Sequence, residues 1–393
     1  MLPVSLLVLS LLILAVWVVR FQHTLAFLKG DHIIDSFSLA ALPVPYPKIS
    51  VIIPARNEEA NIGACLASLL EQDYPNYEVI VVNDRSTDKT AAIVQAKQGA
   101  AKNLKLIHVE KLVPGWTGKN NALNHGIAHA TGDWFLFTDA DTVHQRNSLS
   151  LALGHAHRRR AQMLSLVPSL ENKTFWEKVL QPVAGGALML RYPLREVNNP
   201  QKKLAFGNGQ FILIQKEIYF KIGGHAAVKD FMLEDVAMGK LAKRSGVALH
   251  VGYGAHLFRT RMYPNFAAIF RGWSRIYYSA FGESLFFLAG LIALVWLVSL
   301  APFFLAAYSI WLLFAQFDFF SIILFAVVVL QFVVIYPTLL NTYRISRSDP
   351  GYITFYPLAC VLLSGMLTHA LFKILFKQKV HWRGDRYTEN RTR

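Results

Sequence analysis

Two carboxylates stand one residue apart at the end of an apolar run, in the stretch DWFLFTDADT (133–142). Like charges this close repel, so Asp139 and Asp141 need a compensating cation or a helix end. Mg²⁺ or Mn²⁺ would serve, because a hard divalent cation prefers carboxylate oxygens and also takes phosphate oxygens as ligands. A D-x-D pair is common in loops, however, and on its own it is more often structural than a metal site.

A lysine and a second acid pair could complete such a site. Lys119, in GWTGKNNALNHG (115–126), stands at the start of a predicted helix, where backbone N–H groups and an ammonium both favour phosphate. Glu234 and Asp235 precede a helix-like stretch, and a carboxylate there could take the proton of an acceptor hydroxyl. The structural alternatives are a solvated helix end for Lys119 and a helix cap for Asp235.

The elements that must position these residues alternate between strand-like and helix-like patterns. Short β-branched or apolar runs are followed by helix-like stretches. Asn57 and Ser86 are predicted to cap two helices, and Thr117 or Gly118 to open a third. This alternation predicts an α/β fold with a mainly parallel sheet and helices on both faces. The strand-like runs are 48–55, 77–84, 104–110, 133–141 and 163–168.

Polar residues follow three of these runs. Ligands bind parallel sheets at the carboxyl ends of the strands, so these residues are expected to lie along one edge and to form the candidate site. Turn formation and helix capping are the alternative roles for Asp84 and Asp88. The residues concerned are Arg56–Glu58, Asn83–Asp88, and Asp139 with Asp141.

Several long apolar segments predict a membrane protein, and 53% of the 393 residues are apolar. Residues 1–19 carry no charge and are long enough to span a bilayer. A cleaved signal peptide is the alternative, but the basic n-region and a small-residue cleavage site are missing. Three more apolar runs, 285–315, 319–340 and 355–376, follow near the other end.

The net charge and the cysteine content limit which binding partners and which cellular compartment are expected. A net charge of +15 indicates attraction to anionic lipid headgroups or to anionic small substrates. Nucleic acid is not an expected partner, because no helix-turn-helix, aromatic RNA-binding or zinc-finger pattern accompanies the charge. Only two cysteines occur, Cys65 and Cys360, so no disulfide framework is implied and the soluble part is expected in a reducing compartment.

The basic residues around the apolar runs predict the orientation. Arg20, His23 and Lys29 follow the first run, which places the following soluble region in the cytoplasm by the positive-inside rule. Three simple spans would then leave the basic C-terminal tail outside, although its charge prefers the inside. One run is therefore expected to be re-entrant or divided, and the 31-residue run containing Pro302 is the candidate.

Taken together, these residues resemble the family-two glycosyltransferases of the GT-A fold. The resemblance covers roughly residues 48–280, with the motifs in the family's order. The segments GWTGK, GNGQ with KIGGH, and MYPNFAAIFRGWSR are most similar to a membrane subgroup that includes hopene-associated, diaponeurosporenoate and, more distantly, ceramide glucosyltransferases. The motifs are IPARNEE (53–59), VVNDRSTDKT (81–90), GWTGKNNALNHG (115–126), TDAD (138–141), GNGQ (207–210) and LEDVAMG (233–239).

The resemblance implies roles for individual residues. Asp235 would deprotonate the acceptor hydroxyl, with Glu234 beside it, and the sugar would invert at its anomeric carbon. Asp141, with Asp139, would ligate Mg²⁺ or Mn²⁺. The nucleotide-sugar would contact Asn57, Glu58, Asp84 (near the uracil), Lys119, Asp139 and Arg275, and the acceptor would contact Asn208, Gln210 and Trp273.

One stretch departs from the family pattern. Many relatives, especially those that build polysaccharides processively, carry Q-x-x-R-W after the acid pair, whereas this chain has RGWSR, with Trp273 ahead of Arg275. The departure leaves the roles of these two residues open. An independent interpretation is an interface helix, because Phe266, Phe270, Trp273 and Tyr277 form an apolar stripe at helical spacing.

The sequence thus predicts a multi-pass enzyme of a bacterial-type inner membrane that moves a sugar, UDP-linked by expectation, to a lipid at the cytoplasmic face. A processive polysaccharide synthase and a polyprenyl-phosphate sugar synthase are the alternatives, and a catalytically inactive scaffold is disfavoured because the acids are present. Nothing in the sequence indicates the sugar, the lipid or the oligomeric state. The predicted segments are an N-terminal anchor (1–20), a linker (21–47), a GT-A domain (48–260), an amphipathic interface helix (261–283), transmembrane helices (284–377) and a basic cytoplasmic tail (378–393).

Overall fold

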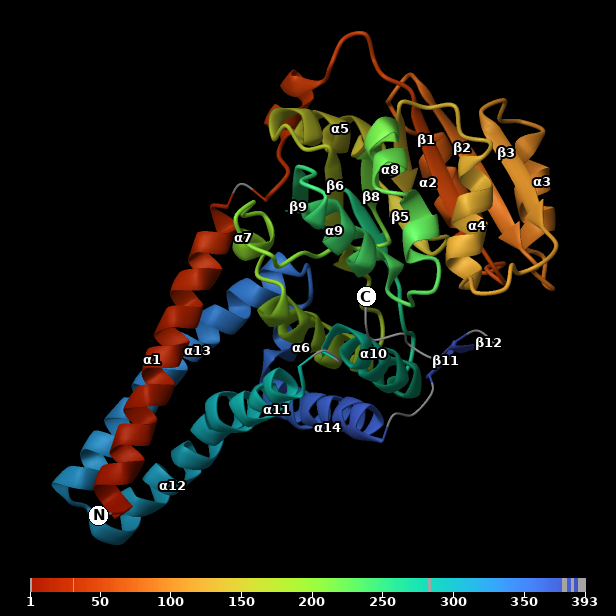
Figure 1. The fold of residues 1–393 in the computed structure, drawn as a ribbon. Helices are drawn as coiled ribbons and strands as arrows, with labels where there is room; N and C mark the ends of the chain where they lie inside the picture. The colour runs from red at the N-terminus through yellow and green to blue at the C-terminus, as the bar shows by residue number, and fades with distance from the viewer. Residues whose placement is uncertain (1, 31, 282–283, 377–379, 383–384, 388–393) are drawn as a thin grey trace. The chain divides into compact units, whose positions relative to one another are not determined.

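The computed structural model divides the chain into two compact units, which we describe separately (Figure 1). The helical unit comprises residues 1–30, 172–188 and 263–386, and the sheet unit comprises residues 31–171, 189–262 and 387–393. The structure describes residues 2–30, 32–281, 284–376, 380–382 and 385–387. Most of the predicted tail, 378–393, lies outside the described residues, apart from the short strands β11 (Val380–Trp382) and β12 (Asp385–Tyr387).

A seven-stranded sheet forms the centre of the sheet unit, in the order β3-β2-β1-β4-β8-β6-β9. All neighbouring strands are parallel except β8, which runs antiparallel to both β4 and β6. The predicted mainly parallel sheet is therefore confirmed. The strands are β1 (Ile49–Ala55), β2 (Tyr77–Asp84), β3 (Leu104–Val109), β4 (Trp134–Phe137), β6 (Met163–Val167), β8 (Ile212–Gln215) and β9 (Leu249–Tyr253).

Helices cover both faces of this sheet, which explains why the central strands are apolar on both sides. Val51 and Ile53 on one face of β1 belong to the same core as α2 (Ile62–Leu70) and α5 (Ser148–Arg158). On the opposite face lies α4 (Gly118–Ile127). A Cβ added at Gly126 would come within 2.8 Å of Val82, so glycine lets this helix approach the sheet closely.

The antiparallel strand β8 explains how the GNGQ segment reaches the predicted edge. Its first residue, Ile212, pairs with Phe137 at the end of β4. Residues 207–210 immediately precede β8, so they enter the sheet at the edge where β4 ends. A separate small sheet, β5-β10-β7, supports this edge with β5 (Thr142–His144), β7 (Ser169–Leu170) and β10 (Phe258–Thr260).

Two predicted helix caps are wrong and one is confirmed. Asn57 has a positive φ of 55° and lies in a loop, because α2 begins only at Ile62. Ser86 likewise lies in a loop, and α3 (Thr90–Gln98) has Lys89 at its N-cap. Thr117 does cap α4, since its side chain accepts a hydrogen bond from the Asn120 N–H.

Among the described residues of the helical unit, four helices are long and apolar enough to cross a membrane: 4–28 within α1 (Leu2–Leu28), 285–316, α13 (Phe319–Ile345) and 350–375, which contains α14 (Tyr356–Leu375). Helix α6 (Phe175–Arg191) is not among them, as predicted. Buried polar contacts join these helices: Gln331 of α13 donates to Ser10 of α1, and the Trp17 indole N–H of α1 donates to the Val298 carbonyl at 2.9 Å.

The run around Pro302, predicted to be re-entrant or divided, is one continuous helical segment, and a re-entrant path stays a prediction. Helix α11 (Leu285–Leu294), a π-helical segment (Val295–Leu300) and α12 (Ala301–Gln316) follow one another without a break. Pro302 lacks an N–H and falls at the start of α12, and the Ala301 N–H bonds back to the Trp296 carbonyl, five residues earlier. The proline therefore coincides with a local change from π-helix to α-helix, and the helix is not broken there.

Part of the apolar stripe predicted to lie in the membrane interface is covered by protein. It lies on α10 (Phe266–Phe281), which packs along α14. The Tyr277 hydroxyl donates to the Ala184 carbonyl of α6 at 2.9 Å, and Phe270 contacts His369 of α14. Tyr277 is fully buried, so helix–helix packing accounts for this part of the stripe.

Candidate active site

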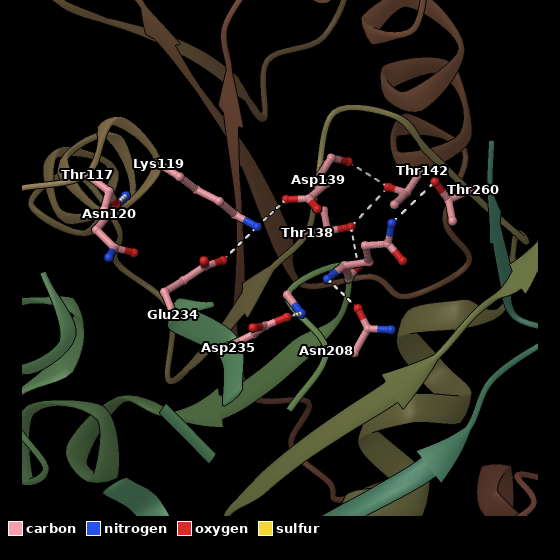
Figure 2. A network of polar contacts seen from close by, with 12 residues as sticks. Thr117, Lys119, Asn120, Thr138, Asp139, Thr142, Asn208, Glu234, Asp235 and Thr260 are labelled. Atoms are coloured by element: carbon pink, nitrogen blue, oxygen red, sulfur yellow. Dashed lines mark hydrogen bonds and ion pairs between the residues drawn. The ribbon is translucent and has the colours of Figure 1, made fainter. Parts of the chain in front are cut away.

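The Lys119 ammonium lies between two carboxylates at the carboxyl edge of the sheet (Figure 2). Its Nζ is 2.7 Å from Asp139 Oδ1 and 2.7 Å from Glu234 Oε1. Lys119 is the second residue of α4, Asp139 follows β4, and Glu234 is the first residue of α9 (Glu234–Arg244). Three elements far apart in the sequence therefore converge on one cation, and the Lys119 and Asp139 side chains remain 30% and 28% exposed, within reach of a ligand.

Asp235 lies beside this pair and is held by two backbone donors. Its Oδ2 accepts from the Gly209 N–H at 2.7 Å, and its Oδ1 accepts from the Val236 N–H at 2.8 Å. Each carboxylate oxygen has two lone pairs, so both oxygens keep the capacity to accept a further hydrogen. The predicted acid pair thus enters the site from the first turn of α9, where the helix N-terminus favours negative charge.

Glycine at position 209 lets the turn before β8 approach the acids. A Cβ there would lie 2.9 Å from Lys119 Nζ, 3.0 Å from Glu234 Oε1 and 3.3 Å from Asp235 Oδ2. Any larger residue would push the ammonium away from its partners. Sequence reasoning noted GNGQ as a motif but did not assign this glycine a role, which depends on a tertiary contact.

Burial and mutual charge shift the pKa values of this group. Burial raises the pKa of Glu234 to about 7 against the opposing effect of Lys119, and it also raises the pKa of Asp235 despite its two backbone donors. For Lys119, burial alone would lower the pKa, but Asp139, Glu234 and Asp235 outweigh it and raise the pKa above its usual value. The ammonium therefore stays charged while one acid beside it titrates near neutral pH.

Asp84 ends β2 near the start of α4 and is paired with its neighbour. The Arg85 guanidinium donates to both Asp84 oxygens, at 2.8 and 3.2 Å, and a Cβ added at Gly118 would lie 2.9 Å from Asp84 Oδ2. Gly118 thus lets the helix N-terminus come close to this carboxylate. Arg85, with a positive φ of 54°, is a charged residue of the site that sequence reasoning did not single out.

Asn57 and Glu58 tie the loop after β1 to neighbouring segments. Asn57 Oδ1 accepts from the Thr87 N–H at 2.8 Å. Glu58 is buried, accepts from the Asn61 side chain at 2.8 Å, and its N–H donates to the Thr90 hydroxyl. The structure thus gives both residues a structural role at the predicted edge.

Asn208 and Gln210 shape the turn that carries Gly209. Asn208 Oδ1 accepts from the Gln210 N–H at 3.0 Å, and the Asn208 N–H donates to the Ser165 hydroxyl at 2.8 Å. The Gln210 side chain donates to the Thr260 hydroxyl at 3.4 Å (Figure 2). Ser165 and Thr260 are further residues that the sequence did not identify.

The donor set suits Mg²⁺ or Mn²⁺ when a phosphate ligand is present. Among the described residues, no three His, Cys, Asp or Glu side chains gather as a metal-binding group. Asp139 and Asp141 are nevertheless hard oxygen donors, and Mg²⁺ typically takes one or two carboxylates plus substrate phosphates and water. Together with Glu234 and Asp235 they also outnumber the Lys119 ammonium, so the charge of the group favours a cation.

Trp273 and Arg275 belong to α10 in the helical unit, and we describe them by their contacts there. The Trp273 ring packs against Tyr277, and its indole nitrogen is buried without a hydrogen-bond partner among the described residues. An Arg275 guanidinium nitrogen donates to the Tyr263 hydroxyl at 3.3 Å. Their predicted contacts with acceptor and donor stay predictions.

Comparison with known proteins shows what this domain is similar to. Residues 50–223 match the family model described as glycosyl transferase family 2, and this range includes Asp84, Lys119, Asp139 and Gly209. Residues 50–223 therefore resemble a family 2 glycosyl transferase domain. A mannosyltransferase from Pyrobaculum calidifontis, PcManGT, solved with GDP-Man and Mn²⁺, shares the fold: its TM-score is 0.53 at 20% identity, covering 94% of this chain and 99% of that one.

Curated relatives with similar sequences are named as diaponeurosporenoate glycosyltransferases. The chain is 30% identical over 235 residues to the 4,4'-diaponeurosporenoate glycosyltransferase of Staphylococcus aureus strain MRSA252, and 29% identical to that of strain NCTC 8325. Each match covers 58% of this chain and 60% of the relative. The predicted family and the GT-A-type fold are therefore confirmed for this domain.

Proposed function

We propose that this protein is a membrane-bound, metal-dependent, inverting glycosyltransferase that moves a sugar from a UDP-linked donor to a lipid at the cytoplasmic face. One observation carries the proposal: the Lys119 ammonium is paired with Asp139 and Glu234, and Asp235 lies beside them. The group stands at the strand ends where α/β folds bind ligands, inside a family 2 domain.

In this proposal the protein binds the donor through its nucleoside diphosphate. Lys119 binds the diphosphate, while Asp84 and Glu58 face the nucleoside. Held by Asp139 and Asp141, Mg²⁺ or Mn²⁺ would neutralise charge that develops on the leaving diphosphate. When the diphosphate binds, its oxygens become new anionic partners of Lys119. The pairing of Lys119 with Asp139 and Glu234 therefore changes when the donor binds.

Asp235 acts as the general base. Burial raises its pKa, so it accepts a proton more readily than an exposed aspartate. The acceptor hydroxyl passes its proton to Asp235 as its oxygen forms a bond to the anomeric carbon. The bond from that carbon to the diphosphate oxygen breaks, the nucleoside diphosphate leaves with the electron pair, and the anomeric configuration inverts.

A lipid acceptor is favoured by the apolar helices of the chain. Four helices within the described part of the chain are suited to crossing a membrane, and the curated relatives are named for diaponeurosporenoate. Asn208, Gln210 and Trp273 are assigned to the acceptor and Arg275 to the diphosphate, as the motif resemblance implies. We assign the protein to the inner membrane of a bacterial-type cell, with the sheet unit in the cytoplasm.

Membranes from cells that express the wild type or Asp141→Ala test the proposal. Each receives a panel of radiolabelled UDP- and GDP-sugars with a total lipid extract, with and without a divalent-metal chelator. We expect label in the organic phase only for the wild type without chelator, and from a UDP-sugar. Label in insoluble polymer would instead support a polysaccharide synthase, and chelator-resistant transfer would contradict the metal assignment.

A further inference from the structure

A buried histidine on β5 contacts the two threonines that flank Asp139–Asp141. His144 is 4% exposed, and its ring is stacked on Phe258 with centroids 5.5 Å apart and an interplanar angle of 12°. Its Nε2 is 3.1 Å from the Thr138 hydroxyl and 3.0 Å from the Thr142 hydroxyl. One ring nitrogen therefore meets two hydroxyl groups, one on each side of the Asp139–Asp141 turn.

Counting hydrogens identifies the tautomer of this ring. The Thr138 hydroxyl donates to the Gln210 carbonyl at 2.8 Å, and the Thr142 hydroxyl donates to the Asp139 carbonyl at 2.7 Å (Figure 2). The two hydroxyl oxygens also lie 3.0 Å apart, but each group has only one hydrogen, and with both hydrogens on the carbonyls both oxygens accept from the ring. Nδ1 is buried with no hydrogen-bond partner among the described residues, so a hydrogen there would be unsatisfied and Nε2 carries it. Burial lowers the pKa of His144 to about 3, so the ring is neutral and Nδ1 is bare at neutral pH.

The hydroxyls oriented by this N–H hold two turns of the site. Thr142 holds the Asp139 carbonyl, in the turn that carries Asp139 and Asp141. Thr138 holds the Gln210 carbonyl, in the turn whose Gly209 N–H binds Asp235. The imidazole thus links the proposed metal-binding turn to the turn that positions the proposed base, without touching either carboxylate.

We propose that His144 is a positioning residue for sugar transfer: as the Nε2–H tautomer it keeps the Asp139–Asp141 turn in register with the Gly209 turn. The inference rests on the proposed function, because it concerns how well the two turns bind a metal–nucleotide complex. The competing view is that the ring only fills space between Phe211 and Phe258.

Two substitutions separate these views. In His144→Gln the amide N–H₂ reaches about as far as Nε2 does and can donate to both threonines. In His144→Asn the amide is one carbon shorter and falls short of them. Both place a polar amide in the same apolar surroundings, so a space-filling role predicts similar effects for the two. Thr142→Ser and Thr142→Val form a second pair, with and without the hydroxyl.

The control is another buried histidine of the sheet unit. His155 is fully buried and packs against His250, 5.1 Å away, and its Nδ1 lies 3.5 Å from the Ser38 hydroxyl. His155→Asn and His155→Gln therefore report the general cost of replacing a buried imidazole. Unfolding temperatures of all variants show which comparisons involve proteins of equal stability.

The readout is binding of Mn²⁺ in the presence of UDP, followed by electron paramagnetic resonance on the purified full-length chain, with transfer kinetics alongside. We expect His144→Asn and Thr142→Val to bind Mn²⁺ about tenfold more weakly, and His144→Gln and Thr142→Ser to stay within about threefold of the wild type. The His155 variants should bind Mn²⁺ as the wild type does.

Wild-type affinity in His144→Asn, or an equal loss in His144→Asn and His144→Gln, would overturn the inference. If His144→Asn is too unstable to measure, the threonine pair decides in the same way. A wild type that binds no Mn²⁺ with UDP would contradict the proposed function itself. The two failures are therefore distinguishable.

Discussion

The chemistry of single residues in this site is dominated by acids gathered around one ammonium. Asp139 and Glu234 each contact Lys119 Nζ at 2.7 Å, and Asp235 lies close by. Ionised acids in a partly dry site are costly unless a cation offsets them. The raised pKa values of Glu234 and Asp235 are the direct consequence, and they lead to a prediction about pH.

The stability of the metal-free protein should depend on the ionisation of Glu234. Its pKa in the folded chain, about 7, is above that of an ordinary glutamate, so the folded state holds a proton that the unfolded state releases. This stabilisation is complete below the unfolded pKa and is lost as pH rises through about 7. We therefore expect Glu234→Gln to raise the unfolding temperature more at pH 8 than at pH 5.

Thermal unfolding of both proteins in chelator-containing buffer checks this. Glu110→Gln, which changes an exposed glutamate, reports the general effect of removing one negative charge. A gain that is larger at pH 5 than at pH 8 would mean that the Glu234 pKa is not raised.

At the scale of elements, the turn before β8 lies close to α4 and α9. We expect sugar transfer to depend on this close approach. We expect Gly209→Ala to reduce transfer at least about tenfold, because the added methyl displaces the Lys119 ammonium. The unfolding temperature should change little, since the end of a lysine side chain moves easily. Transfer kinetics with thermal unfolding measure both effects.

Gly99→Ala is the matched control for that substitution. Its Cβ would meet nothing within 4 Å, and its backbone is helical, so stability should be unchanged or higher by about 0.5–1 kcal/mol. Full activity in Gly209→Ala would show that Lys119 tolerates displacement and does not hold the diphosphate.

Sequence patterns predicted the strands with long β-branched runs, such as β1 and β2, because burial on both faces requires continuous apolar residues. The strands β8 and β9 were missed, because ILIQ is only four residues long and LHVGY contains histidine and glycine. Helix starts were placed too early at Asn57, whose positive φ extends the loop. Local sequence does not indicate such a turn, since its conformation is held by Thr87.

For the site, residue types predicted the acids and Lys119 but not how they are paired. Two carboxylates after a strand are visible in the sequence, whereas the Lys119–Glu234 contact depends on α9 lying opposite α4. The same holds for Gly209 and His144, whose roles come from distances to residues far along the chain. The sequence therefore predicted which residue types form the site, but not which of them contact one another.

At the scale of the whole molecule, buried polar contacts hold the apolar helices together. The Trp17 indole donates to the carbonyl of Val298, in the π-helical segment before Pro302, and Arg20 lies over its ring at 4.2 Å. We expect Trp17→Phe to lower the unfolding free energy in detergent by about 2 kcal/mol, because the buried side chain loses its hydrogen bond and part of its packed volume.

Trp311→Phe provides the comparison, since Trp311 is 58% exposed within the structure. Chemical unfolding of both variants in the same detergent measures the difference. Equal stability of the two would mean that the hydrogen bond from α1 contributes nothing to holding these helices together.

The central claim is that Asp235 removes the acceptor proton while other residues bind the donor. The most direct test measures sugar transfer and donor affinity in the same Asp235→Asn preparation, with Glu234→Gln as the isosteric change at the neighbouring acid. We predict that Asp235→Asn loses transfer by at least about 100-fold and keeps its affinity for the UDP-sugar within about threefold. Retained transfer, or a donor affinity that falls as far as the rate, would contradict the claim.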